Sequence, residues 1–321
     1  MKDVKKEVEK AEKKIRVHIR KTYLEHSHYF SKIGDANIFL KLENTQITGS
    51  FKLRGALNSI LSLSDEEKGK GIITASTGNH GAAVSYAMKK LGLKGKIYVP
   101  ENISAAKLEV LQAYNTDLFF YGTDNAITET NARKTAESEG SFYISPYNDP
   151  KVIGGQGTIG IEIIDQLKNI DAVFVPVGGG GLIAGIAGYL KSVLPEIKII
   201  GCQPENSHVM FDSVKAGKIL EIDCPPSISD GTAGGVEEGS ITFDICRDCI
   251  DEFVLVSEEE IENALKLVLQ KSHMMVEGAA ALSVASFLKV RNKYKNKNIV
   301  LILSGNKLGF ETLRKIVSGG K

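Results

Sequence analysis

Four consecutive glycines at residues 178–181 constrain this chain more than any other feature of its sequence. They follow an apolar, β-branched segment, Ala172 to Val177, and they precede a helical apolar pattern that begins at Leu182. Strand, glycine turn and helix form an anion site in α/β proteins, because N–H groups that lack Cβ neighbours can close on one phosphate and the helix dipole favours its charge. The run therefore predicts a site for a phosphorylated ligand.

A dinucleotide is the first alternative, because residues 179–184 read Gly-x-Gly-x-x-Ala. That fingerprint also needs an acidic residue at the end of the next strand, roughly 20 residues on, to hold a ribose. The next expected strand, Lys198 to Cys202, is followed by Gln203, although Glu205 is close. We therefore favour a single compact phosphomonoester over a dinucleotide.

A lysine has an unusual position in a second motif, residues 48–56. Ser50 is the expected N-cap, and the apolar spacing from Phe51 onward predicts a helix. Lys52 then lies in the first helical turn, where the helix dipole disfavours a cation. An isolated lysine of this kind is usually a surface residue, but one whose ammonium is destabilised has a lowered pKa and can form a Schiff base.

Two further motifs follow buried strands. Residues 73–83 read as strand, polar glycine loop and helix, and the amides and hydroxyls of Ser76 to Gly81 suit a carboxylate. For His80 alone, a helix-capping role is an equal alternative to contact with a substrate. The fourth motif is the apolar run 300–303, which ends in the small hydroxyl residue Ser304.

Length and charge set the broad class. The 321 residues are enough for one large or two modest α/β domains, and 40 basic against 39 acidic residues leave no basic stripe for nucleic acid. Residues 1–21 carry one apolar helical stripe, which indicates a helix on the body of the protein. The uncharged stretch 172–190 is broken by glycines and Pro176, so we expect no membrane span and a cytoplasmic protein.

The four cysteines are too few for a disulfide framework at this length. Cys246 and Cys249 have the spacing of a redox or metal pair, but the residues around them read as an amphipathic helix. We therefore expect a structural role for both cysteines.

Short β-branched runs alternate with helical patterns along most of the chain, which predicts an α/β fold of open, mostly parallel sheets with helices on both faces. The expected strands are residues 38–42, 71–75, 96–99, 118–121, 142–145, 172–177, 198–202, 252–256 and 298–303. Helices are expected at 79–91 and 125–139, and Ser257 to Glu260 form a capping box that opens another.

Taken together, the four motifs have the order and spacing of one enzyme family. From about His26 to its end, the chain resembles the serine/threonine dehydratases and serine racemases, which are fold type II (tryptophan-synthase-β-like) pyridoxal-phosphate enzymes. The resemblance implies a small domain, residues 55–142, inserted into a large domain of residues 1–54 and 143–321. It also implies pyridoxal 5′-phosphate (PLP) between the domains, a small amino acid as substrate, and a homodimer or homotetramer.

The resemblance further assigns roles to individual residues. Lys52 holds the cofactor as an internal aldimine and, once displaced, removes the Cα proton of the substrate. Asn79 hydrogen-bonds the phenolic oxygen of the cofactor, and Ser304 faces its pyridine nitrogen as a neutral hydroxyl. The other implied cofactor contacts are Phe51 at the ring and Gly178, Gly179, Gly180 and Gly181 at the phosphate. The implied contacts to the substrate carboxylate are Ser76, Thr77, Gly78, Asn79 and His80.

Three positions depart from the family pattern. Metal-dependent members carry carboxylates where this chain has Gln203 and Val209, and Mg²⁺ or Ca²⁺ needs several anionic oxygens, so we expect no metal even though Glu205 and Asp212 are near. Racemases place a serine acid at the position of Thr77, which keeps the hydroxyl but adds a methyl group. Glu277 lacks the usual following proline, and its role is left open between a substrate contact and a structural one.

The function that follows is a PLP-dependent ammonia-lyase, which eliminates the β-hydroxyl of L-threonine or L-serine to give a 2-oxo acid and ammonia. The chain ends soon after the Ser304 strand, which leaves no room for an amino-acid-sensing domain, so we expect a catabolic enzyme. The alternatives are a serine racemase, a dehydratase of another 3-hydroxy amino acid and, from a different class, an amino-acid-binding protein without turnover. The lysine at position 52 counts against the last of these.

Overall fold

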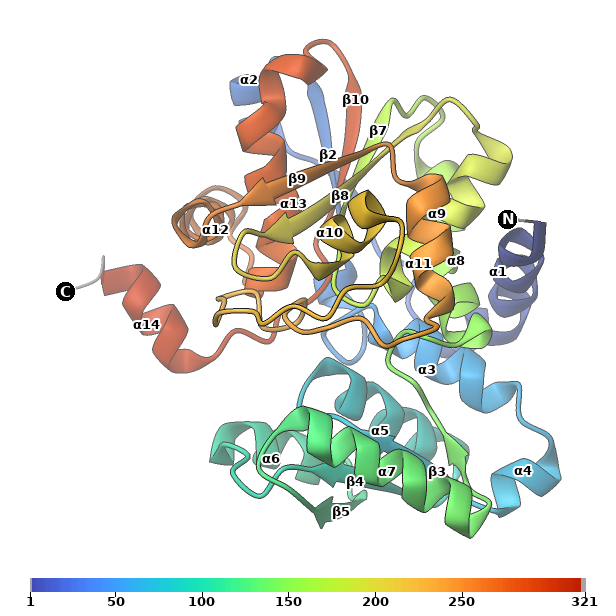
Figure 1. Ribbon diagram of the computed structural model, residues 1–321. Helices are drawn as coiled ribbons and strands as arrows, with labels where there is room; N and C mark the ends of the chain where they lie inside the picture. Colours follow the sequence, from blue (N-terminus) through green and yellow to red (C-terminus); the bar gives the residue numbers. More distant parts are fainter. Residues whose placement is uncertain (1, 319–321) are drawn as a thin grey trace.

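The computed structural model describes residues 2–318 and shows two lobes, each built on one sheet (Figure 1). The six-stranded sheet of the large lobe has the order β1 (Leu24–His26), β2 (Asn37–Lys41), β10 (Asn298–Ile302), β7 (Ala172–Pro176), β8 (Lys198–Pro204) and β9 (Glu252–Val256). The four-stranded sheet of the small lobe (residues 72–143) has the order β5 (Asp117–Phe120), β4 (Gly95–Val99), β3 (Ile72–Ala75) and β6 (Phe142–Tyr143).

Every strand pair except β1–β2 is parallel, which confirms the predicted α/β class. All nine predicted strands are present. Strand β1 is absent from the predicted set, because three residues are too few to show a periodicity. The proposed domain boundary after residue 142 falls inside the two-residue strand β6, and the boundaries themselves stay a prediction.

Helices cover both faces of each sheet, as expected for parallel strands. Their bounds are α1 (Lys2–Ile15), α2 (His28–Gly34), α3 (Lys52–Leu61), α4 (Asp65–Gly69), α5 (Asn79–Leu91), α6 (Ala105–Gln112), α7 (Asn125–Glu139), α8 (Pro150–Gln166), α9 (Gly181–Val193), α10 (Val209–Ala216), α11 (Ile241–Cys249), α12 (Glu258–Leu267), α13 (Gly278–Val290) and α14 (Phe310–Ser318). Helices α5 and α7 have the predicted bounds, and the predicted capping box opens α12.

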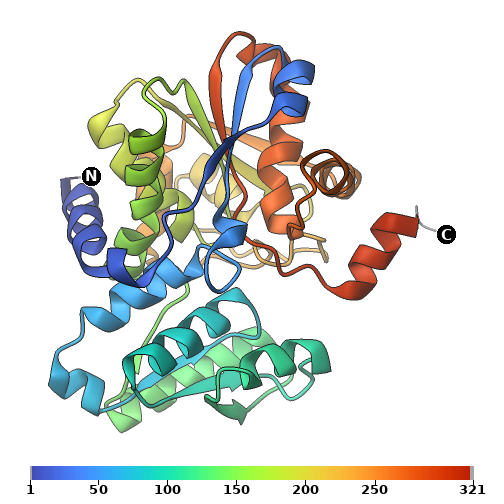
Figure 2. The same cartoon turned by 180° about the vertical axis from the view of Figure 1, so that it is seen from behind.

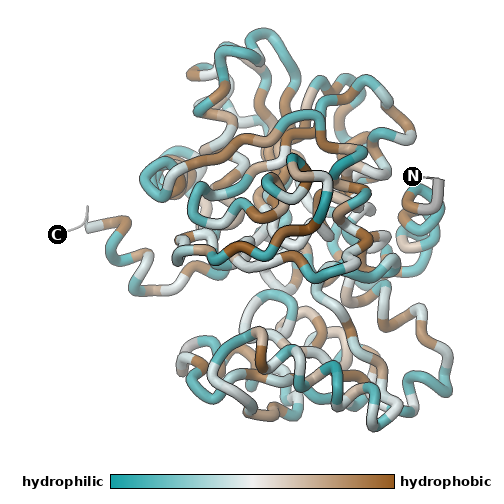
Figure 3. Tube along the Cα trace, viewed as in Figure 1, coloured by the Kyte–Doolittle hydropathy of each residue, from teal (hydrophilic) through white to brown (hydrophobic). Residues whose placement is uncertain are grey.

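Strand β7 shows why the large sheet is buried on both sides. Phe174 packs in one apolar cluster with α13, whereas Val173 and Val175 point to the opposite face and pack with α8 and α9. In Figure 3 the hydrophobic segments run along the central strands, and the hydrophilic segments lie in the outer turns and helix surfaces. The alternation of side chains along a strand thus builds two cores from one continuous apolar run.

The N-terminal helix lies on the body of the protein, as its stripe predicts. Val8, Ala11 and Ile15 of α1 are fully buried. Seen from behind, α1 lies beside α8, and α3 lies below them between the two lobes (Figure 2). Cys246 and Cys249 of α11 are also buried, in agreement with a structural role. No helix within residues 2–318 has both the length and the apolarity needed to cross a bilayer.

Candidate active site

The glycine run closes the carboxyl end of β7 and starts α9. Gly180 has a φ of +89°, the left-handed conformation that favours glycine, and α9 begins at Gly181, one residue before the expected Leu182. A Cβ atom on Gly179 would lie 2.6 Å from the ring of Tyr147, and one on Gly181 would lie 2.8 Å from the Cβ atom of Tyr147. Any side chain at these two positions would therefore collide with Tyr147, so the run presents its N–H groups without side chains.

Lys52 is the first residue of α3 and so lies in the first helical turn, as the sequence predicts, although the helix begins one residue later than expected. Its Nζ atom donates a 2.8 Å hydrogen bond to the carbonyl oxygen of Pro146 and lies 5.3 Å from the centre of the Phe51 ring. Burial lowers the pKa of Lys52 to about 8, and the more distant carboxylates of Glu277 and Glu129 oppose this shift only in part. A substantial neutral fraction at mild pH is what an amine nucleophile requires.

Ser50 does not cap α3, so this prediction is wrong. Its backbone is paired with Gly305 in an isolated antiparallel bridge, and the N-cap position is taken by Phe51, which makes no side-chain cap hydrogen bond. The next residue extends the same pairing, because Phe51 N–H donates to the carbonyl of Ser304 at 3.1 Å. This short pairing holds the start of α3 against the end of β10, and so brings the Lys52 and Ser304 motifs together.

The polar loop that follows β3 leads into α5. A Cβ atom on Gly81 would lie 2.4 Å from the carbonyl oxygen of Ser76, so the loop turns tightly there. Thr77 and Gly78 are half-buried within the turn, and Gly78 N–H donates to the Ser76 hydroxyl at 3.2 Å. The first N–H groups of α5 have no partner within the helix, so this end of α5 is suited to a carboxylate.

His80 points away from that opening into the core. The side chain is buried, and Nε2 lies 3.1 Å from the carbonyl oxygen of Ile144, which makes Nε2 the protonated nitrogen. Burial and, to a smaller extent, Lys52 lower the pKa of His80 to about 3, so the ring is neutral. Nδ1 is buried without a partner. The geometry is that of a structural histidine, and its predicted contact with a substrate carboxylate stays a prediction.

Asn79 contacts a residue whose role the sequence left open. Its Nδ2 atom donates to the two carboxylate oxygens of Glu277, at 3.0 Å and 2.8 Å. Asn79 begins α5 in the small lobe, and Glu277 immediately precedes α13 in the large lobe. A cavity of about 270 Å³ adjoins Glu277 and is also lined by Asp230 and Lys307.

Some of the buried polar atoms that lack hydrogen-bond partners lie on predicted site residues, where a cofactor could satisfy them. They include the Ser304 hydroxyl and the Oδ1 atom of Asn79, both on predicted site residues. A buried polar atom without a hydrogen bond costs roughly 1–3 kcal/mol, so two of them on adjoining motifs are a pair of contacts that a bound ligand would stabilise. Together with the glycine cradle and the lysine of lowered pKa, these atoms fit PLP.

Pro146 and Tyr147 are not among the predicted site residues. The segment follows β6 and carries the carbonyl that holds Lys52 and the ring that covers the glycine loop. The Tyr147 hydroxyl accepts a hydrogen bond from Glu237 N–H at 3.0 Å. The only signal in the sequence is an aromatic residue in a turn-rich stretch after a strand, which does not distinguish a site residue from a loop residue.

Gln203 and Val209, where the resemblance implies carboxylates in metal-dependent members, have other contacts in this structure. Gln203 accepts a 2.9 Å hydrogen bond from Phe211 N–H, and Val209 is buried in the core at the start of α10. The nearby Glu205 pairs with Lys289 at 3.2 Å. Within residues 2–318, no three His, Cys, Asp or Glu side chains are grouped so that they could hold a metal ion.

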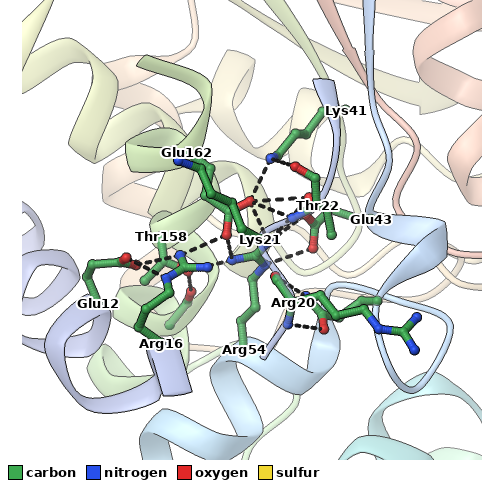
Figure 4. A network of polar contacts seen from close by, with 12 residues as sticks. Glu12, Arg16, Arg20, Lys21, Thr22, Lys41, Glu43, Arg54, Thr158 and Glu162 are labelled. Carbon is green, nitrogen blue, oxygen red and sulfur yellow. Dashed lines mark hydrogen bonds and ion pairs between the residues drawn. The ribbon is translucent and has the colours of Figure 1, made fainter. Parts of the chain in front are cut away.

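A buried network of charges fixes the helix that carries Lys52 (Figure 4). Arg54 is fully buried and makes a bidentate pair with Glu43, with both N···O distances at 2.8 Å. Its guanidinium also donates to Glu162 of α8, which takes a further 2.6 Å hydrogen bond from Lys41 of β2. Burial alone would raise the pKa of Glu162, but Arg54 and Lys41 outweigh it and lower that pKa well below its usual range.

The fold and these residues define an enzyme that binds a phosphorylated aldehyde through a lysine. Residues 15–305 match the family of pyridoxal-phosphate-dependent enzymes. The chain is 40% identical over 308 residues to the catabolic L-threonine dehydratase TdcB of Escherichia coli (strain K12), covering 95% of this chain and 93% of that protein. The chain belongs to the pyridoxal-phosphate-dependent enzyme family, and its cofactor is PLP.

Solved structures agree in fold over almost the whole chain. The processed form of threonine deaminase isoform 2 from Solanum lycopersicum superposes with a TM-score of 0.92 at 37% identity, over 98% of this chain and 93% of that one. Maize serine racemase also gives a TM-score of 0.92, at 31% identity, over 98% of this chain and 97% of that one. The resemblance noted from the four motifs, including its fold type, is confirmed.

Proposed function

We propose that this chain is a catabolic L-threonine/L-serine ammonia-lyase, which removes the β-hydroxyl and releases a 2-oxo acid and ammonia. One observation carries the proposal. Residues 146 and 147 hold the Lys52 amine on one side and cover the glycine loop on the other, so the nucleophile and the phosphate cradle share one wall. The relative in Escherichia coli is a catabolic threonine dehydratase, which supports the choice of reaction.

The proposed roles follow from the position of each side chain. When bound, PLP supplies an electron sink for the negative charge that develops at the substrate Cα. Gly178 to Gly181 bind its phosphate, with the positive end of the α9 dipole behind them. Phe51 lies against its ring, and Ser304 offers a neutral hydroxyl to the ring nitrogen. Because that hydroxyl carries no charge, it does not hold a proton there as a carboxylate would, which favours elimination over transamination.

Lys52 has two proposed tasks. Its neutral amine first binds the cofactor aldehyde, and the amine released by the substrate then takes the Cα proton. The lowered pKa serves both tasks, because each needs an unprotonated nitrogen. The substrate carboxylate is bound by Ser76, Thr77, Gly78 and the backbone N–H of Asn79 at the positive end of α5, with His80 completing the loop behind them. Thr77 is also the candidate for a second catalytic acid on the opposite face, which is the role that a racemase requires.

A 2-oxo-acid assay over a panel of 3-hydroxy amino acids tests the reaction and the substrate together. We expect 2-oxobutanoate from L-threonine and pyruvate from L-serine, and no product from either with Lys52→Ala. Stoichiometric ammonia should accompany each product. A panel with no turnover would overturn the proposal in favour of an amino-acid-binding protein, and turnover confined to another 3-hydroxy amino acid would change the substrate.

Serine racemase is the second candidate, because Thr77 keeps the hydroxyl that a second acid needs and maize serine racemase has the same fold. Chiral analysis of the serine recovered from the assay separates the two reactions. The lyase predicts that release of pyruvate outpaces formation of D-serine.

We also propose a cytoplasmic homodimer or homotetramer with residues 55–142 as the inserted domain. Large apolar side chains on the surface support self-association, since Tyr23 and Phe310 are each 74% exposed. Light scattering of the purified protein measures the assembly, and a single monomeric species at micromolar concentration would contradict it.

A further inference from the structure

The contact between Asn79 and Glu277 joins the two lobes at the cofactor site. Asn79 is the first residue of α5, in the small lobe, and Glu277 is the N-cap residue of α13, in the large lobe. A single nitrogen, Nδ2, lies within hydrogen-bond distance of both carboxylate oxygens, at 3.0 Å and 2.8 Å. The carboxylate therefore determines the rotation of the Asn79 amide.

The carboxylate is itself held rigidly. Glu277 is only 4% exposed, and its backbone N–H donates to the carbonyl of Gly305 at 3.0 Å. Its Oε2 atom accepts from Lys307 N–H at 3.3 Å. A Cβ atom on Gly305 would lie 2.5 Å from Oε1, so only glycine leaves room for the carboxylate beside Ser304. Glu277 is thus packed against the turn that follows the predicted pyridine-facing hydroxyl.

With Nδ2 held, the other polar atom of the amide faces elsewhere. Asn79 Oδ1 is buried and has no hydrogen-bond partner. A buried carbonyl oxygen needs a donor, and the donors available in this site are N–H and O–H groups of the cofactor, the substrate or Lys52. The orientation of the amide therefore decides whether Asn79 offers an acceptor or a second donor to the reacting groups.

We propose that Glu277 is a positioning residue for the reaction, which fixes the Asn79 amide with Oδ1 turned toward the bound cofactor and substrate when the lobes are closed. This inference rests on the proposed placement of Asn79 beside the cofactor. It gives Glu277 a role through Asn79, without contact to the substrate.

Two ion pairs also join the lobes in this arrangement. Lys107 of α6 pairs with Asp230 at 3.5 Å, and Arg133 of α7 pairs with Glu237 at 2.9 Å. Both join the small lobe to the loop between α10 and α11 in the large lobe. These pairs are partly exposed and so contribute little energy, whereas Glu277 in the Asn79–Glu277 contact is buried and sets the geometry.

The charge state of Glu277 gives the proposal a pH dependence. Burial raises the pKa of Glu277 to about 7, with a smaller contribution from Asp230 in the same direction, while Asn79 and Lys307 oppose the shift. Lys52 is the other charged group that Glu277 influences. Below pH 7 the Glu277 carboxyl gains a proton and can donate a hydrogen bond to Asn79 Oδ1. The Asn79 side-chain amide can then flip, so that Oδ1 faces Glu277 and Nδ2 faces the site. Above pH 7 only the orientation seen here is favoured.

The test titrates the visible absorption of the bound cofactor between pH 5.5 and 9 in the holoenzyme, and measures kcat and KM over the same range. The variants are Glu277→Gln, Glu277→Asp and Asn79→Ala, with Glu259→Gln, an exposed residue of α12, as the matched control. For the native protein and the control we expect a spectral transition near pH 7 that is absent in Glu277→Gln. Glu277→Asp, which no longer reaches Asn79, should lose about tenfold in kcat, equivalent to one hydrogen bond to a charged group, with KM changed less.

Each result decides the proposal. A Glu277→Gln protein that keeps both the transition near pH 7 and the native spectrum overturns it, even if Asn79→Ala alters the spectrum. If Asn79→Ala also leaves the spectrum native, Asn79 does not lie beside the cofactor. That result contradicts the proposed function's placement of Asn79, and the role of Glu277 that depends on it is then wrong as well. Circular dichroism checks that each variant is folded. If Glu277→Gln does not fold, the test uses Glu277→Asp instead.

Discussion

The Nζ atom of Lys52 donates a 2.8 Å hydrogen bond to the carbonyl oxygen of Pro146. A neutral carbonyl can accept from the amine in either protonation state, so this contact holds the side chain without demanding an ammonium ion. Burial then dominates, and it lowers the pKa of Lys52 to about 8. The hydrogen bond to Pro146 therefore positions the Lys52 amine, and burial keeps that amine reactive.

We therefore expect the apoenzyme to capture PLP at a rate that depends on pH with a defined sign. The neutral amine is the nucleophile, so below pH 8 the rate should rise by about tenfold per pH unit, and above pH 8 it should level off. Stopped-flow absorbance at the cofactor band measures this profile. Lys52→Ala should give no covalent capture at any pH.

Lys307 is the alternative candidate for the lysine that binds the cofactor covalently. Burial also lowers the pKa of Lys307 to about 8, and its Nζ atom is buried without a partner. After reduction with borohydride, peptide mass spectrometry should find the cofactor on Lys52 and leave Lys307 unmodified. Reduced cofactor on Lys307 would refute the role given to Lys52.

Arg54 should be one of the most sensitive positions for stability. Arg54→Met leaves Glu43 and Glu162 buried without their shared cation, and breaking a buried pair in this way costs about 3–5 kcal/mol. Arg54→Lys should cost less than methionine but remain destabilising, because an ammonium cannot make the bidentate contact. Urea unfolding followed by circular dichroism measures the free energy of unfolding for each variant.

The control for Arg54 is Arg314→Met. Arg314 also pairs with a glutamate, Glu311, but both side chains are 67% exposed, so the expected loss is about 0–1 kcal/mol. If the two arginine variants unfold at similar urea concentrations, the buried network does not stabilise the fold as described.

Activity should survive chelation of divalent metals. The resemblance implies carboxylates in metal-dependent members at the positions of Gln203, which is engaged with Phe211 N–H, and of the buried Val209. Neither side chain can offer an anionic oxygen to Mg²⁺ or Ca²⁺. A 2-oxo-acid assay in EDTA should therefore match the untreated enzyme, whereas loss of activity that magnesium restores would show that Glu205 or Asp212 has rebuilt a site.

Much of this architecture could be predicted, because its determinants are local. A strand such as β7 can be predicted from its apolar run, and the glycine turn and the helix that follow β7 are adjacent to it in sequence. Three of the four motifs also fall at strand ends, after β3, β7 and β10, where parallel sheets gather their functional loops. Local pattern sufficed for nine of the ten strands, for a phosphorylated ligand at the glycine run and for the position of Lys52 in the first helical turn, whereas PLP itself was implied by the family resemblance.

What the sequence did not reveal depends on contacts between distant segments. Ser50 has the composition of an N-cap, but its backbone is committed to Gly305, about 250 residues away, and pairing between segments so far apart leaves no local signal. Pro146 contributes only a carbonyl, which every residue carries. Glu277 meets Asn79 across the lobes, and no periodicity or spacing links the two.

The Thr77 hydroxyl decides between the lyase and the racemase. If it only binds the substrate carboxylate, Thr77→Ala should weaken substrate binding by roughly 1.5–3 kcal/mol, one hydrogen bond to a charged group, with turnover changed less. If it is also the second acid, solvent deuterium should enter D-serine in the native enzyme and not in Thr77→Ala. Thr77→Ser, which removes the crowding methyl group, should then raise racemisation. We expect pyruvate release to dominate in all three proteins, and a native enzyme that interconverts serine enantiomers faster than it releases pyruvate is a racemase.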